Sequence, residues 1–182
     1  MTVDGDLAEA AWNVTSYNVN FGGLGSATVR YLRNDNNLYI GVVVKGGASQ
    51  VTPQLQVYFD EDHDGIADSG DDAWFVGLGA SSGQDYHYNG DGGYTSDTGN
   101  ATEGAGTTAS GDAVFELRHP LCEDSSGDIC AGFGDEPPLG IDFRYVVGGD
   151  SSVSAPGPDR FDPKTNWADL TLQDVDDTAP TV

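Results

Sequence analysis

The main pattern along this chain is the alternation of apolar and polar residues with a period of two. It is clearest in residues 27–45, ATVRYLRNDNNLYIGVVVK, where two alternating segments flank the turn-forming residues 34–37. We predict a β-hairpin there. Its second strand is apolar on both faces, which favours a central position in a sheet.

The same alternation predicts further strands along the chain. They span 54–60, 72–79, 113–121, 139–149 and 167–172. Little of the sequence suggests helix. We therefore predict an all-β fold, an antiparallel β-sandwich of the jelly-roll type with calcium-stabilised loops.

Residues 80–111 are rich in Gly, Ser, Thr and Asp. They contain one short aromatic segment, in which Tyr86 and Tyr88 share a face and His87 faces the other way. We expect the rest to be a long loop that is functional or held by an ion.

A dense run of carboxylates lies between the strands predicted at 54–60 and 72–79. Calcium takes six to eight oxygen ligands at about 2.3–2.6 Å, and a D-x-D-x-D-G spacing brings three carboxylates to one point before a sharp glycine turn, here at Gly65. The alternative is a solvated acidic hairpin tip. The expected ligands are Asp60, Asp62, Asp64, the carbonyl of Ile66, and Asp68, with Asp71 or Asp72 as the bidentate closing ligand. Candidates for a second ion are Asp85, Asp91, Asp97 and Glu103.

Charge limits the function further. The 182 residues include 30 acidic and 7 basic side chains, so the net charge is −23. This field repels phosphate backbones and anionic membranes, which argues against nucleic-acid binding and favours a secreted or cell-surface protein in calcium-containing or salty water. No apolar run approaches the roughly 20 residues of a membrane helix, so no membrane insertion is expected.

We expect one domain over residues 1–174, and a linker over 175–182 that leads to a neighbouring module of the same polypeptide. Cys122 and Cys130 bracket a short polar loop, which in a secreted protein favours a local disulfide. A zinc site at this pair is less favoured, because none of the three histidines has ligand spacing to the two cysteines.

Several motifs together resemble carbohydrate-binding module family 9-like domains, which are also related to DOMON-type domains. VDGDLAEAAW (3–12) is similar to an opening of the form DG-x-x-x-E-x-x-W, and Trp12 in it is expected in the core. The 27–45 hairpin and the LQVYFDEDHDG segment are similar to the next two motifs, and FELRHPL places Glu116 and Pro120 at the family's Glu and Pro. The resemblance extends from Val3 to Leu172.

The resemblance implies an antiparallel sandwich, structural Ca²⁺ and, in members that bind sugar, two aromatic rings that enclose a terminal saccharide. The two rings cannot be placed residue by residue. Ring candidates are Trp74, Tyr86, Tyr88 and Trp167, with Tyr94 nearby, and candidate polar partners are Gln84, Asn89, Asp91 and Arg144. Related folds hold haem through Met, His or Lys. The only methionine is Met1, which argues against a methionine axial ligand, while His87 and the two lysines leave that alternative open.

The sequence contains no G-x-S-x-G, H-E-x-x-H or phosphate-binding glycine motif, so no enzyme activity is expected. The leading hypothesis is a non-catalytic, calcium-binding carbohydrate-binding module of a secreted or cell-surface multidomain protein, for instance attached to a glycoside hydrolase. Its partner would be a polysaccharide or oligosaccharide. The alternative is a structural or adhesive spacer module with no glycan ligand.

Overall fold

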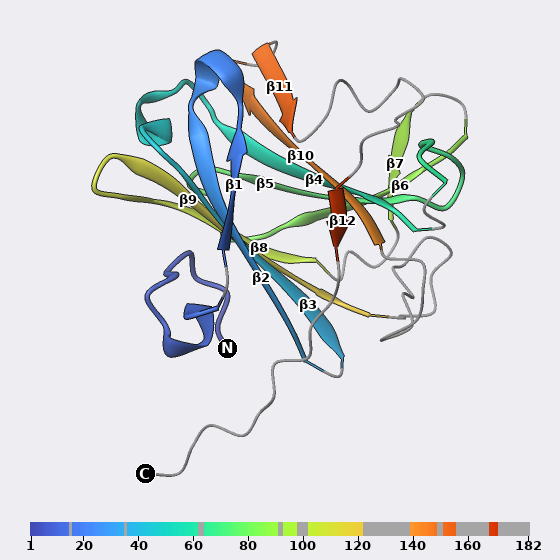
Figure 1. The fold of residues 1–182 in the computed structure, drawn as a ribbon, viewed down its shortest axis with the longest axis horizontal. Helices are drawn as coiled ribbons and strands as arrows, with labels where there is room; N and C mark the ends of the chain where they lie inside the picture. The colour runs from blue at the N-terminus through green and yellow to red at the C-terminus, as the bar shows by residue number, and fades with distance from the viewer. Residues whose placement is uncertain are drawn as a thin grey trace.

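Two antiparallel sheets face each other in the computed structural model of this chain (Figure 1). The structure describes residues 1–14, 16–34, 36–61, 64–90, 93–97, 102–121 and 140–148, and the backbone alone at 139, 151–155 and 168–170. Within these ranges the only helices are single 3₁₀ turns, at Ala10–Trp12, Gly22–Leu24 and Gly47–Ser49. The predicted all-β sandwich is confirmed.

The first sheet has five strands in the order β1-β2-β3-β9-β8. Their bounds are Ser16–Asn20 (β1), Ser26–Asn34 (β2), Asn37–Val44 (β3), Asp112–Pro120 (β9) and Glu103–Ala109 (β8). β2 and β3 form the hairpin predicted at 27–45, and β3 is central, between β2 and β9. Its apolar character on both faces is explained by this position.

The second sheet has seven strands, with β11-β10-β4-β5-β6-β7 in order and β12 also paired with β10. Their bounds are Ser151–Ala155 (β11), Leu139–Val147 (β10), Gln54–Asp60 (β4), Asp72–Gly77 (β5), Gln84–Tyr88 (β6), Tyr94–Ser96 (β7) and Ala168–Leu170 (β12). β4 and β5 pair on either side of the acidic loop, as predicted.

The core fills the space between the sheets with residues taken from alternate strand positions. Val42 and Phe115 contribute from the first sheet, and Val57, Trp74 and Phe143 from the second; none of these is exposed. Residues at the intervening positions of β4, β5 and β10 therefore project from the outer face of the seven-stranded sheet.

The N-terminal segment folds over the outer face of the five-stranded sheet. The buried carboxylate of Glu116 accepts hydrogen bonds from the backbone N–H of Asp4 and of Gly5, both at 2.9 Å, and from Trp12 Nε1 at 3.2 Å. Trp12 packs there on Leu32 and Tyr39. The predicted burial of Trp12 is confirmed, but its expected place in the sandwich core is wrong, because it belongs to this separate cluster on the outer face.

The expectation of a long loop over 80–111 is wrong for residues 103–109, which form edge strand β8. β8 lies against the turn after β5, where Gly79 N donates to Gly106 O at 2.8 Å and Gly106 N donates to Ala80 O at 3.0 Å. A Cβ atom at Gly106 would lie 2.2 Å from the carbonyl oxygen of Gly77. Small residues in β8 therefore permit a backbone-to-backbone contact between the two sheets, and they carry none of the apolar alternation that signals a strand.

The described residues contain no helix that is long and apolar enough to cross a membrane.

Candidate functional site

A hollow of about 350 Å³ opens on the outer face of the seven-stranded sheet. Its lining is Gln56, Tyr58, Phe75, Tyr86, Tyr94, Arg144 and Val146. The strand register explains why they meet. Arg144 of β10 lies opposite Gln56 of β4, and Gln56 lies opposite Phe75 of β5, so these three side chains form one row across the sheet.

The aromatic rings of the hollow are in mutual contact. The rings of Phe75 and Tyr86 are 4.6 Å apart between centroids at 34°, and Tyr58 meets the edges of Phe75 at 5.6 Å and Tyr94 at 5.3 Å. Tyr58 is fully buried, whereas Phe75, Tyr86 and Tyr94 are partly exposed. The hollow therefore has a rigid aromatic floor with some ring surface open to a ligand.

Planar polar groups border these rings. Tyr58 donates its hydroxyl to Gln56 Oε1 at 2.5 Å, and Gln56 Nε2 donates to Gln54 Oε1 at 2.7 Å, so the amide of Gln56 is held in one orientation. The guanidinium of Arg144 adds N–H donors in a fixed planar arrangement. Aromatic surface beside fixed amide and guanidinium groups is the combination that recognises a sugar ring.

The acidic loop begins where β4 ends, and its side chains fold back onto its own backbone. Asp60 is fully buried and accepts N–H bonds from Asp64 at 3.2 Å and Gly65 at 2.9 Å. Asp71 accepts N–H bonds from Glu61 at 3.2 Å and Asp68 at 2.9 Å. Gly65 has φ +82°, the left-handed conformation predicted for the sharp turn.

The close spacing of these carboxylates contributes to a raised pKa at Asp71. The pKa of Asp71 is raised to about 7, chiefly by burial; two backbone hydrogen bonds lower it, and the neighbouring charges of Asp60 and Asp68 add to the rise. A divalent cation relieves this kind of repulsion, and carboxylate oxygens are the ligands that calcium prefers. Asp60, Asp64, Asp68 and Asp71 therefore offer the kind of ligand that calcium prefers, although no three of these described carboxylates place ligand atoms within 4.8 Å of one another.

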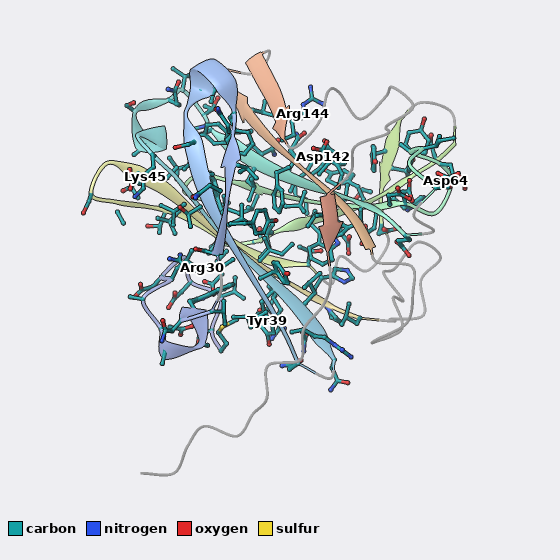
Figure 2. All side chains as sticks on the ribbon, in the orientation of Figure 1. Arg30, Tyr39, Lys45, Asp64, Asp142 and Arg144 are labelled. Atoms are coloured by element: carbon teal, nitrogen blue, oxygen red, sulfur yellow. The ribbon has the colours of Figure 1, made fainter. Side chains whose placement is uncertain are left out.

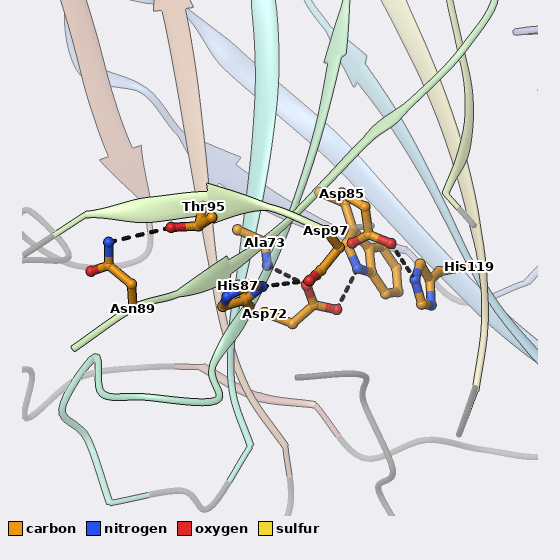
Figure 3. Close-up of polar contacts among 9 residues, drawn as sticks. Asp72, Ala73, Asp85, His87, Asn89, Thr95, Asp97 and His119 are labelled. Carbon is orange, nitrogen blue, oxygen red and sulfur yellow. Dashed lines mark hydrogen bonds and ion pairs between the residues drawn. The ribbon is translucent and has the colours of Figure 1, made fainter. Parts of the chain in front are cut away.

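Asp72 does not belong to this loop set, which corrects its expected role as closing ligand. It lies on the inner face of β5, where it accepts hydrogen bonds from Ala73 N at 2.7 Å and Trp74 Nε1 at 2.6 Å. Among the residues described, one group of three has potential ligand atoms within 4.8 Å of one another, and it joins Asp72 to Asp85 and His119 (Figure 3). Burial, followed by the charge of Asp85, raises the pKa of Asp72 well above its usual value.

The expectation that Trp74 faces a sugar is wrong, because its ring is completely buried between Phe59 and His119. Tyr86 and Arg144 do line the hollow, together with Tyr94, while Tyr88 is 9% exposed and packs edge-on against Tyr94.

Other predicted residues lie elsewhere or are not described. Asn89 donates to Thr95 Oγ1 at 3.3 Å, and Gln84 is exposed on β6. The acids proposed for a second ion are dispersed: Asp97 pairs with His87, and Glu103 pairs with Arg118. Five of the predicted residues lie outside the described ranges: Asp62, Asp91, Trp167, Cys122 and Cys130. The predicted disulfide between the two cysteines lies outside them too.

Sequence reasoning missed Gln56, Tyr58 and Phe75 as lining residues of the hollow. The alternation within each strand was the available signal. Gln56 and Tyr58 alternate with core residues in β4, and Phe75 alternates with core residues in β5, so all three belong to the face opposite the core. Aromatic residues on the face opposite the core of adjacent strands are uncommon unless something binds there or covers them.

Comparisons with known proteins agree with this architecture. No protein-family model matches the chain, and no curated protein matches it. A carbohydrate-binding module family 9 from Caldicellulosiruptor kristjanssonii in complex with cellotriose is similar over 100% of this chain and 94% of its own, with a TM-score of 0.58 at 15% identity. A structure of a carbohydrate-binding module family 9 from the same organism in complex with glucose is similar over 100% of this chain and 95% of its own, with a TM-score of 0.59 at 15% identity. The chain therefore has a carbohydrate-binding module family 9-like fold.

Proposed function

We propose that this chain is a non-catalytic carbohydrate-binding module and that the hollow on the seven-stranded sheet is its saccharide site. The observation that carries the proposal is the partly exposed aromatic group of Phe75, Tyr86 and Tyr94 beside Gln56 and Arg144. Two proteins of similar fold are described in complex with cellotriose and glucose, which supports a β-glucan oligosaccharide as the first ligand to test.

Binding would divide the sugar between two kinds of surface. The C–H face of a pyranose packs on the rings of Phe75 and Tyr86, and its hydroxyls accept from Arg144 and exchange hydrogen bonds with Gln56. A net charge of −23 disfavours acidic polysaccharides. A neutral glycan therefore suits this surface best.

Calcium in the acidic loop would support the same site, with Asp60, Asp64, Asp68 and Asp71 supplying oxygen ligands. The loop is joined to the site by backbone: Gly70 N donates to Tyr88 O at 3.4 Å, and Tyr88 N donates to Asp71 O at 2.7 Å. A cation that fixes the loop thus fixes the ends of β4, β5 and β6, which carry Tyr58, Phe75 and Tyr86. We place such a module outside the cell in a multidomain protein, where it holds a partner domain near its polysaccharide.

Calorimetric titration with cellotriose and glucose, and retention on glucan-containing affinity gels, test the proposal. Tyr86→Ala and Arg144→Ala should each weaken binding by about tenfold, the equivalent of roughly 1.4 kcal/mol for one lost ring contact or charged hydrogen-bond group.

Arg30→Ala is a matched control, because Arg30 lies on β2 of the other sheet and its loss changes the charge equally (Figure 2). It should leave binding unchanged. Folded wild-type protein that retains no glycan, or binding that Tyr86→Ala and Arg144→Ala leave intact, would reject the site and favour the spacer function.

A further inference from the structure

A second polar group, distinct from the acidic loop, is enclosed between the sheets. Asp72 on β5 and Asp85 on β6 project inward from the seven-stranded sheet, and His119 on β9 meets them from the five-stranded sheet (Figure 3). Their exposed fractions are 1%, 3% and 0%. Two carboxylates and an imidazole with so little contact with water need a compensating charge.

The hydrogen-bond partners of His119 define where its protons lie. Nδ1 contacts the carbonyl oxygen of Pro120, which can only accept, so Nδ1 carries a hydrogen. Nε2 lies 2.8 Å from Asp85 Oδ2. A neutral imidazole protonated at Nδ1 presents a lone pair at Nε2, and a lone pair facing a carboxylate oxygen requires either another proton or a cation.

A cation is favoured by the remaining oxygen of Asp85. Asp85 Oδ1 is buried and makes no hydrogen bond with any described residue. If a proton on Nε2 were the only positive charge here, Asp85 Oδ1 would remain buried without a hydrogen bond. The free-energy cost of such an unsatisfied acceptor is several times RT. A metal ion beside Asp85 would satisfy it through a shared or bidentate carboxylate.

The surrounding groups hold the three side chains as the outer shell of a metal site does. The Pro120 carbonyl fixes the His119 tautomer, Trp74 Nε1 and Ala73 N each bind one oxygen of Asp72, and the Trp74 ring stacks on the imidazole at 4.8 Å and 13°. One ligand atom from each of the three residues lies within 4.8 Å of the others. A tetrahedral ion with bonds of about 2.0–2.2 Å places its ligands about 3.4 Å apart, so modest side-chain rotation suffices.

We propose that Asp72, Asp85 and His119 form an inter-sheet binding site for one small first-row divalent cation of the zinc class. An imidazole nitrogen with two carboxylates suits zinc, whereas calcium prefers six or more oxygens and larger spacing. The ion would link β5 and β6 to β9 and so connect the two sheets beneath the acidic loop. This proposal is independent of sugar binding.

The test begins with wild-type protein freed of metal by dipicolinate, passed into chelator-free buffer and kept in excess Ca²⁺. Titration with Zn²⁺ should give one equivalent bound and a rise in melting temperature. Co²⁺ in its place should give the visible absorption bands of a four- or five-coordinate site. Wild-type protein that is folded and binds no Zn²⁺ or Co²⁺ overturns the proposal.

Variants locate the ion. His119→Gln and Asp85→Asn should each weaken zinc binding by more than roughly 100-fold. His87→Gln is the matched control, because His87 is a half-buried histidine on β6 that pairs with Asp97 outside the group of three. It should bind zinc as the wild type does, and zinc binding that survives His119→Gln but is lost in His87→Gln contradicts the assignment.

Imidazole ¹⁵N NMR spectra of the wild type test whether zinc binds His119, even if the substituted proteins fail to fold. Zinc at Nε2 should shift that nitrogen alone and leave Nδ1 protonated. A buried histidine that shows two equally protonated nitrogens, unchanged by zinc, identifies an imidazolium paired with Asp85 and excludes the metal.

Discussion

Tyr145 joins the aromatic core to a loop at the edge of the sandwich. Its ring packs 5.5 Å from Phe21 and 6.2 Å from Phe115, and its hydroxyl donates to Gly47 O at 3.2 Å. Burial raises the pKa of Tyr145 to about 12. The folded state therefore holds the phenol proton more tightly than the unfolded state, whose ordinary pKa is 10.0.

The stability that Tyr145 provides is consequently complete below pH 10 and lost as pH rises through about 12. Tyr145→Phe removes the hydrogen bond and should cost about 1 kcal/mol of unfolding free energy at pH 8, with a smaller difference from wild type at pH 11. Urea denaturation of both proteins across this range measures it. Burial also raises the pKa of Tyr17, so only the difference between the two proteins isolates Tyr145. A constant difference at all pH values would contradict this account.

The residues of β5 also show what the alternation of apolar and polar positions cannot predict. The pattern correctly groups Trp74 with Val76 and Ala73 with Phe75 on the two faces of β5. It cannot say which face is inward, because both are apolar. Packing of the second sheet places Trp74 inside and leaves Phe75 and Tyr86 outside, so a search for sugar-facing rings that starts from tryptophan selects the wrong face.

At the scale of elements, the contact of β8 with the turn after β5 depends on glycine. Gly106→Ala would bring a Cβ atom to 2.2 Å from Gly77 O, and that oxygen belongs to backbone and cannot rotate away. We expect a loss of about 2–3 kcal/mol, or a fall in melting temperature of about 5–10 °C. Calorimetry measures it directly.

Gly23→Ala is the matched control, because a Cβ atom at Gly23 meets nothing within 4 Å. It should be neutral or stabilise slightly by lowering the entropy of the unfolded chain. Equal effects of the two substitutions would show that β8 does not pack as closely as described.

Element-level prediction succeeded where the signal was local. The hairpin of β2 and β3, the strands on both sides of the acidic loop and the turn at Gly65 follow from alternation and turn chemistry. β8 has no such signal, because its small residues are explained only by a contact with the other sheet. The group of Asp85 and His119 was equally inaccessible, since the two residues are 34 positions apart and meet only when the sheets pack.

For the whole molecule, the dominant electrostatic fact is the net charge of −23. Self-repulsion of this size destabilises any compact state, and dissolved salt screens it over a Debye length of about 8–10 Å. Sodium chloride alone should therefore raise the melting temperature. A specific calcium site has to be recognised as an additional effect above that general screening.

Calcium should stabilise the protein more than sodium chloride of equal ionic strength, because it binds only the folded loop. At 100 times its dissociation constant a single ion adds about 2.7 kcal/mol, which corresponds to a rise of about 5–10 °C in melting temperature. Asp64→Asn should remove most of this extra stabilisation.

Asp6→Asn is a close control, since both aspartates are exposed and each accepts an N–H bond from the residue two positions later, Ile66 at 2.7 Å and Ala8 at 2.9 Å. It changes the net charge by the same amount and should leave the calcium effect intact. If the two variants respond alike, or if calcium does no more than matched sodium chloride, the acidic loop is a solvated hairpin tip and the stability of the sandwich depends on its core and on screening alone.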